Sequence, residues 1–289
     1  MKIVILTSNT PSNVWLVNQI LARHEVAALV IESPPPARST QEKRARRRYM
    51  RRRYGLTRTL NKLAYNALRW RILSLVERES LRRNFFPGNA EVAYLRPVPR
   101  VTVANINDRA CVELIKQHRP DVLAVCGTSV IRAEVFTLAP LGALNIHTGI
   151  TPEYRSADPI FWALYHEEPD KVGVTVHFID QGIDTGPIIY QERVPLYAGD
   201  NLSGITARCI RRGAALYLGA LEQLECGPVR TLDRPGVRGR AFYSIELGLV
   251  QYLLFRWRLA RLQPRLPRAP DTDLDPQLEP ATRSAELRQ

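Results

Sequence analysis

The 289-residue chain is poor in cysteine and has no long apolar run, and both absences exclude classes of protein. Its four cysteines, Cys111, Cys126, Cys209 and Cys226, do not form the short paired spacings of a zinc site or a disulfide framework. No run of about eighteen uncharged apolar residues exists, so we expect no ordinary transmembrane helix. The N-terminal stretch Met-Lys-Ile-Val-Ile-Leu meets polar residues too soon for a signal peptide. A reducing cytoplasm is the expected location.

The net positive charge of the chain is concentrated in one segment. The formal net charge is +13, and the segment from Arg38 to Arg83 holds sixteen Lys/Arg against three Asp/Glu, so it carries the whole excess. The rest holds twenty-five of each and is neutral. A segment that is basic on most faces meets phosphate, acidic lipid or solvent more often than a sequence-specific groove. We expect no nucleic-acid partner. The open alternatives are a phosphate-bearing acceptor, a peripheral contact with an anionic membrane surface, and an inserted helical hairpin with solvated arginines.

Apolar runs alternate with helical patterns along the chain. Strands are predicted at about residues 2–6, 25–31, 101–104, 121–125, 143–146, 172–178 and 187–195. Helices are predicted at about residues 13–23, with Ser12 as the N-cap, and at 109–117, 158–166 and 202–224. The β-α-β opening predicts an α/β fold with an open, mostly parallel, Rossmann-like sheet and crossover helices.

The domain organisation follows from these patterns. We expect one principal domain over residues 1–227, interrupted by a basic helical insertion at about residues 37–86, in which Tyr49, Tyr54, Tyr65 and Trp70 alternate with arginines. Residues 228–263 are predicted to form a short C-terminal helical extension. Its residues 246–262 form either a helix that closes the core or a basic interfacial helix. The proline-rich, charged residues 264–289 are predicted to be a disordered tail.

Three polar residues at strand ends and turns carry the most specific chemistry. Asn145 and His147 end the predicted strand at 143–146, two positions apart, so both side chains face one way. Asp184 follows in the turn Asp-Gln-Gly-Ile-Asp-Thr-Gly-Pro. Ligands of parallel sheets bind beyond such C-terminal strand ends. Each residue alone is a common structural feature, but together they supply an amide donor for a developing oxyanion, an imidazole for proton transfer and a carboxylate. We expect the carboxylate to orient the imidazole and to favour its protonated form.

The segment around these residues resembles the folate-dependent formyltransferase family, which transfers the formyl group of 10-formyltetrahydrofolate to an amine. The resemblance covers about residues 1–32 and 98–226. It implies that Asn145, His147 and Asp184 are the catalytic residues and that no metal is required. It also implies that the formyl donor is bound, largely through backbone, by Gly127, Ser129, Val130, Ile131, Ile179, Asp180, Gly182 and Ile183.

Departures from the family pattern bear on the acceptor. Ser8-Asn9-Thr10-Pro11-Ser12 stands where purine-pathway members have a glycine-rich phosphate loop, which disfavours glycinamide ribonucleotide. Initiator-tRNA members carry a C-terminal β-barrel, whereas sixty-three residues follow Cys226 here. A small amine, such as a nucleotide-linked amino sugar, is therefore the expected acceptor. The alternatives are a formyltetrahydrofolate hydrolase, a methionyl-tRNA formyltransferase-like enzyme and a non-enzymatic basic adaptor for nucleic acid or membrane. The sequence specifies no oligomeric state.

Overall fold

Seven strands form one open, mostly parallel sheet in the computed structural model, which describes residues 1–33, 40–69, 74–88, 90–232 and 239–270. The strands, in the sheet order β3-β2-β1-β4-β5-β7-β8, are β3 Arg100–Val103, β2 Val26–Glu32, β1 Ile3–Ser8, β4 Val122–Cys126, β5 Ala143–His147, β7 Gly173–Phe178 and β8 Ile188–Arg193. The first five in the chain run parallel, and β7 and β8 are added by antiparallel pairing. This confirms the predicted α/β fold. The strand order reverses between β1 and β4, where sheets of this kind bind ligands.

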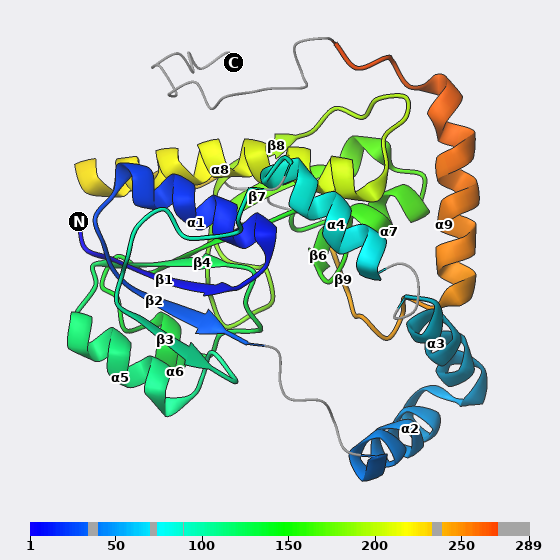
Figure 1. Ribbon diagram of the computed structural model, residues 1–289, viewed down its shortest axis with the longest axis horizontal. Coiled ribbons are helices and arrows are strands. Elements are labelled where there is room, and N and C mark those ends of the chain that lie inside the picture. Colours follow the sequence, from blue (N-terminus) through cyan, green and yellow to red (C-terminus); the bar gives the residue numbers. More distant parts are fainter. Residues whose placement is uncertain (34–39, 70–73, 89, 233–238, 271–289) are drawn as a thin grey trace.

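Helices cover both faces of the sheet (Figure 1). On one face, α1 Pro11–Arg23 and α8 Leu202–Cys226 pack on Ile3 and Ile5 of β1. On the other, α5 Arg109–His118 and α6 Ala133–Phe136 pack on Val4 and Leu6. Burial on both faces explains why the β1 sequence is continuously apolar. The predicted N-cap of α1 was wrong: Thr10 caps this helix, with Pro11 in the first turn, where a missing N–H costs nothing.

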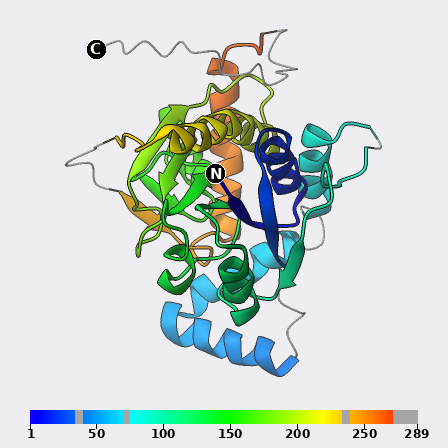
Figure 2. The same cartoon turned by 90° about the vertical axis from the view of Figure 1, so that its left-hand side faces the viewer.

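In the residues that the structure describes, the basic segment contains three α-helices, not a two-helix hairpin. They are α2 Thr40–Tyr54, α3 Leu56–Leu68 and α4 Ser74–Phe85. Helix α4 packs on α1 and α8, with Phe85 tilted against Trp15 at a ring distance of 5.2 Å, so it belongs to the body of the protein. Helix α3 packs on α9 Leu249–Leu262, and α2 packs on α3 at the outer end (Figures 1 and 2). Residues 37–39 and 70–73 of the predicted insertion, with Trp70 among them, lie outside the described residues.

The C-terminal segment closes the other end of the core. Helix α9 packs on α7 Pro159–Tyr165 through Phe255, whose ring lies 4.6 Å from that of Phe161. Strand β9 Arg240–Phe242 pairs with β6 Tyr154–Ser156, beside the predicted site. Two short 3-10 helices, η2 Pro169–Lys171 and η3 Gln263–Arg265, complete the described elements.

The segment predicted as a tail begins against the body of the protein. Within residues 264–270, the Pro267 carbonyl accepts a hydrogen bond of 2.7 Å from the Ala198 amide. The rest of that prediction, residues 271–289, lies outside the described residues. Among the helices that the structure describes, none has the length and hydropathy of a membrane-spanning segment.

Candidate active site

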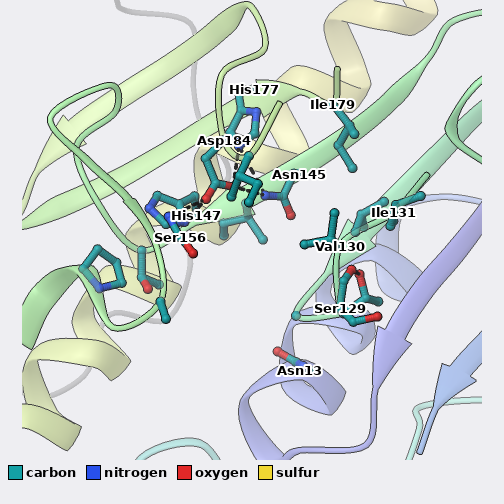
Figure 3. Close-up of a pocket in the computed structure, with 18 of the residues that line it drawn as sticks. Asn13, Ser129, Val130, Ile131, Asn145, His147, Ser156, His177, Ile179 and Asp184 are labelled. Atoms are coloured by element: carbon teal, nitrogen blue, oxygen red, sulfur yellow. Dashed lines mark hydrogen bonds and ion pairs between the residues drawn. The ribbon is translucent and has the colours of Figure 1, made fainter. Parts of the chain in front are cut away.

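Asn145, His147 and Asp184 meet at one edge of the sheet (Figure 3). Asn145 and His147 lie two positions apart in β5 Ala143–His147, so their side chains point to the same side of the sheet. Asp184 lies in the loop between β7 and β8. Its Oδ1 lies 3.4 Å from Asn145 Nδ2, and its Oδ2 lies 3.5 Å from His147 Nδ1. The structure therefore brings Asp184 into contact with both Asn145 and His147.

The Asp184 carboxylate is held by several polar groups. The Ser156 amide of β6 donates to Oδ2 at 2.8 Å, and His177 Nε2 lies 3.5 Å from Oδ1. Asp184 has a φ of 50°, a left-handed backbone that Asp tolerates better than most residues. Burial acts to raise the pKa of Asp184, but His177, His147 and the Ser156 amide outweigh it and lower the pKa to about 2. The carboxylate is therefore ionised at neutral pH.

His147 is held in one tautomer by the backbone. Its Nε2 lies 2.9 Å from the Tyr154 carbonyl, which can only accept, so Nε2 carries the hydrogen. Burial lowers the pKa of His147 below its usual value, against the opposing attraction of Asp184. As expected, Asp184 favours the protonated form of the ring, but desolvation of the buried ring has the larger effect. The neutral ring presents the basic nitrogen Nδ1 toward Asp184.

A fourth residue, His177, completes the cluster and was not foreseen. Its Nδ1 donates to the Phe178 carbonyl at 2.7 Å, so its Nε2 accepts from Asn145 Nδ2 at 3.2 Å. Asn145 Nδ2 thus has two acceptors, His177 and Asp184. Serving as an N–H donor to a substrate requires Asn145 to give up one of these bonds. Asn145 pairs directly with His177 across β5 and β7. The sequence does not show which strands are neighbours, so it could not reveal this contact.

A cavity of about 610 Å³ opens beside the cluster. Two loops form much of its wall, the one after β4 and the one between β7 and β8. All eight residues that the resemblance assigns to the formyl donor line it: Gly127, Ser129, Val130, Ile131, Ile179, Asp180, Gly182 and Ile183. Within the described residues, no group of three or more His, Cys, Asp or Glu side chains is arranged to hold a metal ion.

Short polar contacts fix both loops. Glu32, at the end of β2, accepts from the Ser129 amide and hydroxyl at 2.6 Å each. Asp180 accepts from the Gly182 amide at 2.9 Å and from the Thr185 hydroxyl at 2.6 Å, which closes a tight turn. Gly127 has a φ of +66°, and a Cβ there would lie 2.4 Å from an Asn13 side-chain nitrogen. The loop walls are thus preformed.

Tyr217 of α8 sets the spacing of the strands behind the cavity. Its buried hydroxyl accepts from the Val125 amide of β4 at 2.8 Å and donates to the Leu144 carbonyl of β5 at 2.9 Å. The hydroxyl therefore adds a bridge between β4 and β5 where their backbone pairing reaches the site. Asn145 follows Leu144 directly, so α8 helps to position the cluster.

A second cavity of about 1000 Å³ adjoins the first through Ser129. It lies between the loop from Ser8 to Ser12, at the N-terminus of α1, and helix α4. Arg78 and Glu79 of α4 line its far side. The basic segment thereby contributes directly to the surroundings of the site.

A family profile described as "Formyl transferase" matches residues 1–221. The chain belongs to this family. The resemblance seen around Asn145 and His147 is thereby confirmed. The fold agrees with solved members of the same group. Glycinamide ribonucleotide transformylase 1 from Symbiobacterium toebii superposes with a TM-score of 0.52 at 21% identity, over 81% of this chain and 94% of that one. A sugar N-formyltransferase from a Shewanella species superposes with a TM-score of 0.52 at 14% identity, over 89% of this chain and 87% of that one. Such low identities show the shared fold alone.

Several curated relatives are methionyl-tRNA formyltransferases. The one from Syntrophus aciditrophicus is 35% identical over 129 residues, which are 44% of this chain and 41% of the relative. The one from Methylacidiphilum infernorum is 35% identical over 151 residues, which are 52% of this chain and 46% of the relative. The chain therefore matches less than half the length of each. Membership of the formyl transferase family is established, and the acceptor has to be argued from the site.

Proposed function

We propose that the chain transfers the formyl group of 10-formyltetrahydrofolate to the primary amine of a small acceptor. The carrying observation is that Asp184 contacts both Asn145 and His147 at the mouth of one cavity. Membership of the formyl transferase family supports the same chemistry. Asn145, His147 and Asp184 are the residues that we assign to it.

The first cavity fits the formyl donor. Val130 is 62% exposed although it lines the wall, and Ile131, Ile179 and Ile183 add apolar surface that a flat pterin ring would cover. Backbone groups from Gly127 onward supply polar contacts, as in many preformed ligand sites. When bound there, 10-formyltetrahydrofolate supplies the activated formyl carbonyl.

Each residue of the cluster has a distinct task. His147 Nδ1 accepts the proton that the attacking amine loses, because its ring is neutral and Nε2 is already bonded to Tyr154. His147 then returns this proton to the donor's nitrogen as the bond between that nitrogen and the formyl carbon breaks, so tetrahydrofolate leaves and the ring is neutral again. Asp184 stabilises the imidazolium that results, since it is ionised and 3.5 Å away. Asn145 donates an amide hydrogen to the formyl oxygen by exchanging its bond to His177 or Asp184.

The acceptor that we propose is a small, phosphate-bearing amine of the nucleotide-linked amino sugar kind. Arg78 of α4 lines the second cavity beside Glu79 and supplies the positive charge that a phosphate group would meet there. An acceptor that spans from this cavity past Ser129 would bring its amine to the cluster. Named relatives act on methionyl-tRNA or on sugars, so both belong in the test.

The test incubates the full chain with 10-formyltetrahydrofolate and a panel of amines while tetrahydrofolate release is followed. The panel holds nucleotide-linked amino sugars, glycinamide ribonucleotide and methionyl-tRNA. We expect release only with an amino sugar. Release of tetrahydrofolate and formate without any amine indicates a hydrolase. Turnover with methionyl-tRNA alone would overturn the proposed acceptor but leave formyl transfer intact.

A further inference from the structure

Helix α9 has two apolar stripes, and only one of them is covered. Tyr252, Phe255 and Leu259 pack inward against α7 and its neighbours. The opposite stripe reaches solvent, with exposed fractions of 54% at Val250, 56% at Leu253, 38% at Leu254 and 53% at Trp257. These four positions repeat at i, i+3, i+4 and i+7, the spacing of one helix face. We name them the outer stripe.

Helix α3, which packs on α9, carries further exposed apolar side chains. Leu56 and Leu60, one turn apart, are each 55% exposed. The opposite face of α3 is joined to the α9 region through Lys62, whose Nζ donates to the Leu247 carbonyl at 2.9 Å. Burial lowers the pKa of Lys62 to about 8, which marks this joint as tightly packed. This buried contact anchors α3 to the segment just before α9 and leaves Leu56 and Leu60 exposed.

Helix α2 adds a dense positive charge beside them. It carries one Lys and seven Arg against a single acid, Glu42. The seven arginines are exposed, and in the part of the chain that the structure describes none of them forms an ion pair with a carboxylate. Helices α9, α3 and α2 follow one another down one side of the molecule (Figure 1). Apolar stripe and cationic helix thus share one edge.

We propose that α2, α3 and the outer stripe of α9 form a surface that binds an anionic lipid bilayer. Leu, Val and Trp side chains enter the headgroup region, and the α2 arginines contact acidic headgroups, the combination that holds interfacial helices on membranes. Trp257 is of the residue type enriched at such interfaces. Charge complementarity selects this partner over two others. A symmetric dimer through this edge would bring two arginine-rich α2 helices together. A nucleic acid would match the arginines but leave the outer stripe in water.

The test is vesicle flotation of the full chain at low and high salt. Vesicles of equal parts phosphatidylcholine and phosphatidylglycerol are expected to carry the protein, and pure phosphatidylcholine vesicles are not. Removing charge in Arg44→Gln/Arg48→Gln/Arg51→Gln/Arg52→Gln should weaken binding about fivefold for each arginine and reduce its salt dependence. Gln keeps the helix propensity, so α2 should remain folded.

The apolar variant Leu253→Ser/Trp257→Ser should lose the binding that survives high salt. The matched control Leu141→Ser/Arg132→Gln alters an exposed apolar and an exposed basic residue elsewhere and should bind like the parent. Formyl transfer to a soluble acceptor should be unchanged in every variant, because none of these residues lines either cavity. The proposal is overturned if the parent ignores anionic vesicles, whether it then binds transfer RNA or self-associates through the outer stripe. It is also overturned if the control loses as much binding as the test variants.

Discussion

His147 Nδ1 lies 3.5 Å from Asp184 Oδ2, while its other ring nitrogen is bonded to the Tyr154 carbonyl. The ring therefore has only one nitrogen that can take up a proton, and that nitrogen faces the one ionised carboxylate of the cluster. Burial keeps the ring neutral until substrate arrives, and the carboxylate stabilises the charge that follows. This arrangement is that of a general base with a built-in counter-ion.

Removal of any member of the trio should reduce turnover by at least about a hundredfold, as expected for loss of a general base or of an oxyanion donor. The variants are Asn145→Ala, His147→Ala and Asp184→Asn, the last chosen because Asn tolerates the left-handed backbone there. Tetrahydrofolate release measures activity, and circular dichroism verifies the fold. Near-normal turnover in folded His147→Ala contradicts the assignment.

The pH dependence of activity should reflect the lowered pKa of His147. We expect kcat/KM to be maximal above this pKa and to fall as pH drops through it. That acid limb should lie below pH 6.5, because burial lowers the pKa of His147. Asp184, with a pKa of about 2, stays ionised across the range. In Asp184→Asn the limb should move to still lower pH, since the charge that raises the histidine pKa is gone. A limb above 6.5 in the parent argues against this base.

His177 is a positioning residue whose loss should lower kcat more than it changes KM. In His177→Leu the Asn145 amide loses one acceptor and gains freedom to turn, so we expect kcat to fall about tenfold to a hundredfold. His177→Gln retains a polar partner and should recover part of the rate. The control is His118→Gln, because His118 lies in helix α5 and does not line the cavity. Equal rates for the Leu and Gln variants would rule out the positioning role.

Folate binding should depend on Val130. A folate analogue is expected to raise the Tm of the parent by mass action on the native state. Val130→Asp puts a charge on the cavity wall that the ligand covers, and it should reduce that shift without destabilising the unliganded protein, because the side chain is 62% exposed. Leu141→Asp, 39% exposed and away from the cavity, is the matched control. Identical shifts for both variants would place the ligand elsewhere.

Tyr217→Phe should destabilise the fold by about 1–3 kcal/mol, because it leaves the buried Val125 amide and Leu144 carbonyl without their shared partner. Chemical denaturation measures the free energy of unfolding. Tyr243→Phe removes a hydroxyl from a side chain that is 52% exposed and should change stability by less than about 0.5 kcal/mol. A loss of stability in Tyr217→Phe no larger than in this control would show that the hydroxyl does not hold β4 and β5.

Local patterns in the sequence determined much of the fold. Ile3 to Leu6 reads as a continuously apolar strand because helices bury both of its faces, and the two-residue spacing of Asn145 and His147 fixes them on one side of β5. The turn that bears Asp184 was visible from its glycines. The helical pattern at 202–224 predicted α8, which spans Leu202–Cys226. In each case the signal lies within a few residues, where backbone geometry alone relates sequence to structure.

Only the tertiary structure decided what surrounds these residues. His177 meets Asn145 because β7 adds antiparallel to β5, and Ser156 reaches Asp184 from β6, whose partner β9 follows far along the chain. Burial by distant segments makes His147 neutral against the pull of its carboxylate neighbour. The same dependence separates α4, packed into the body, from α2, which extends outward with its arginines exposed. Desolvation and strand pairing arise from contacts between segments remote in sequence, so no local pattern encodes them.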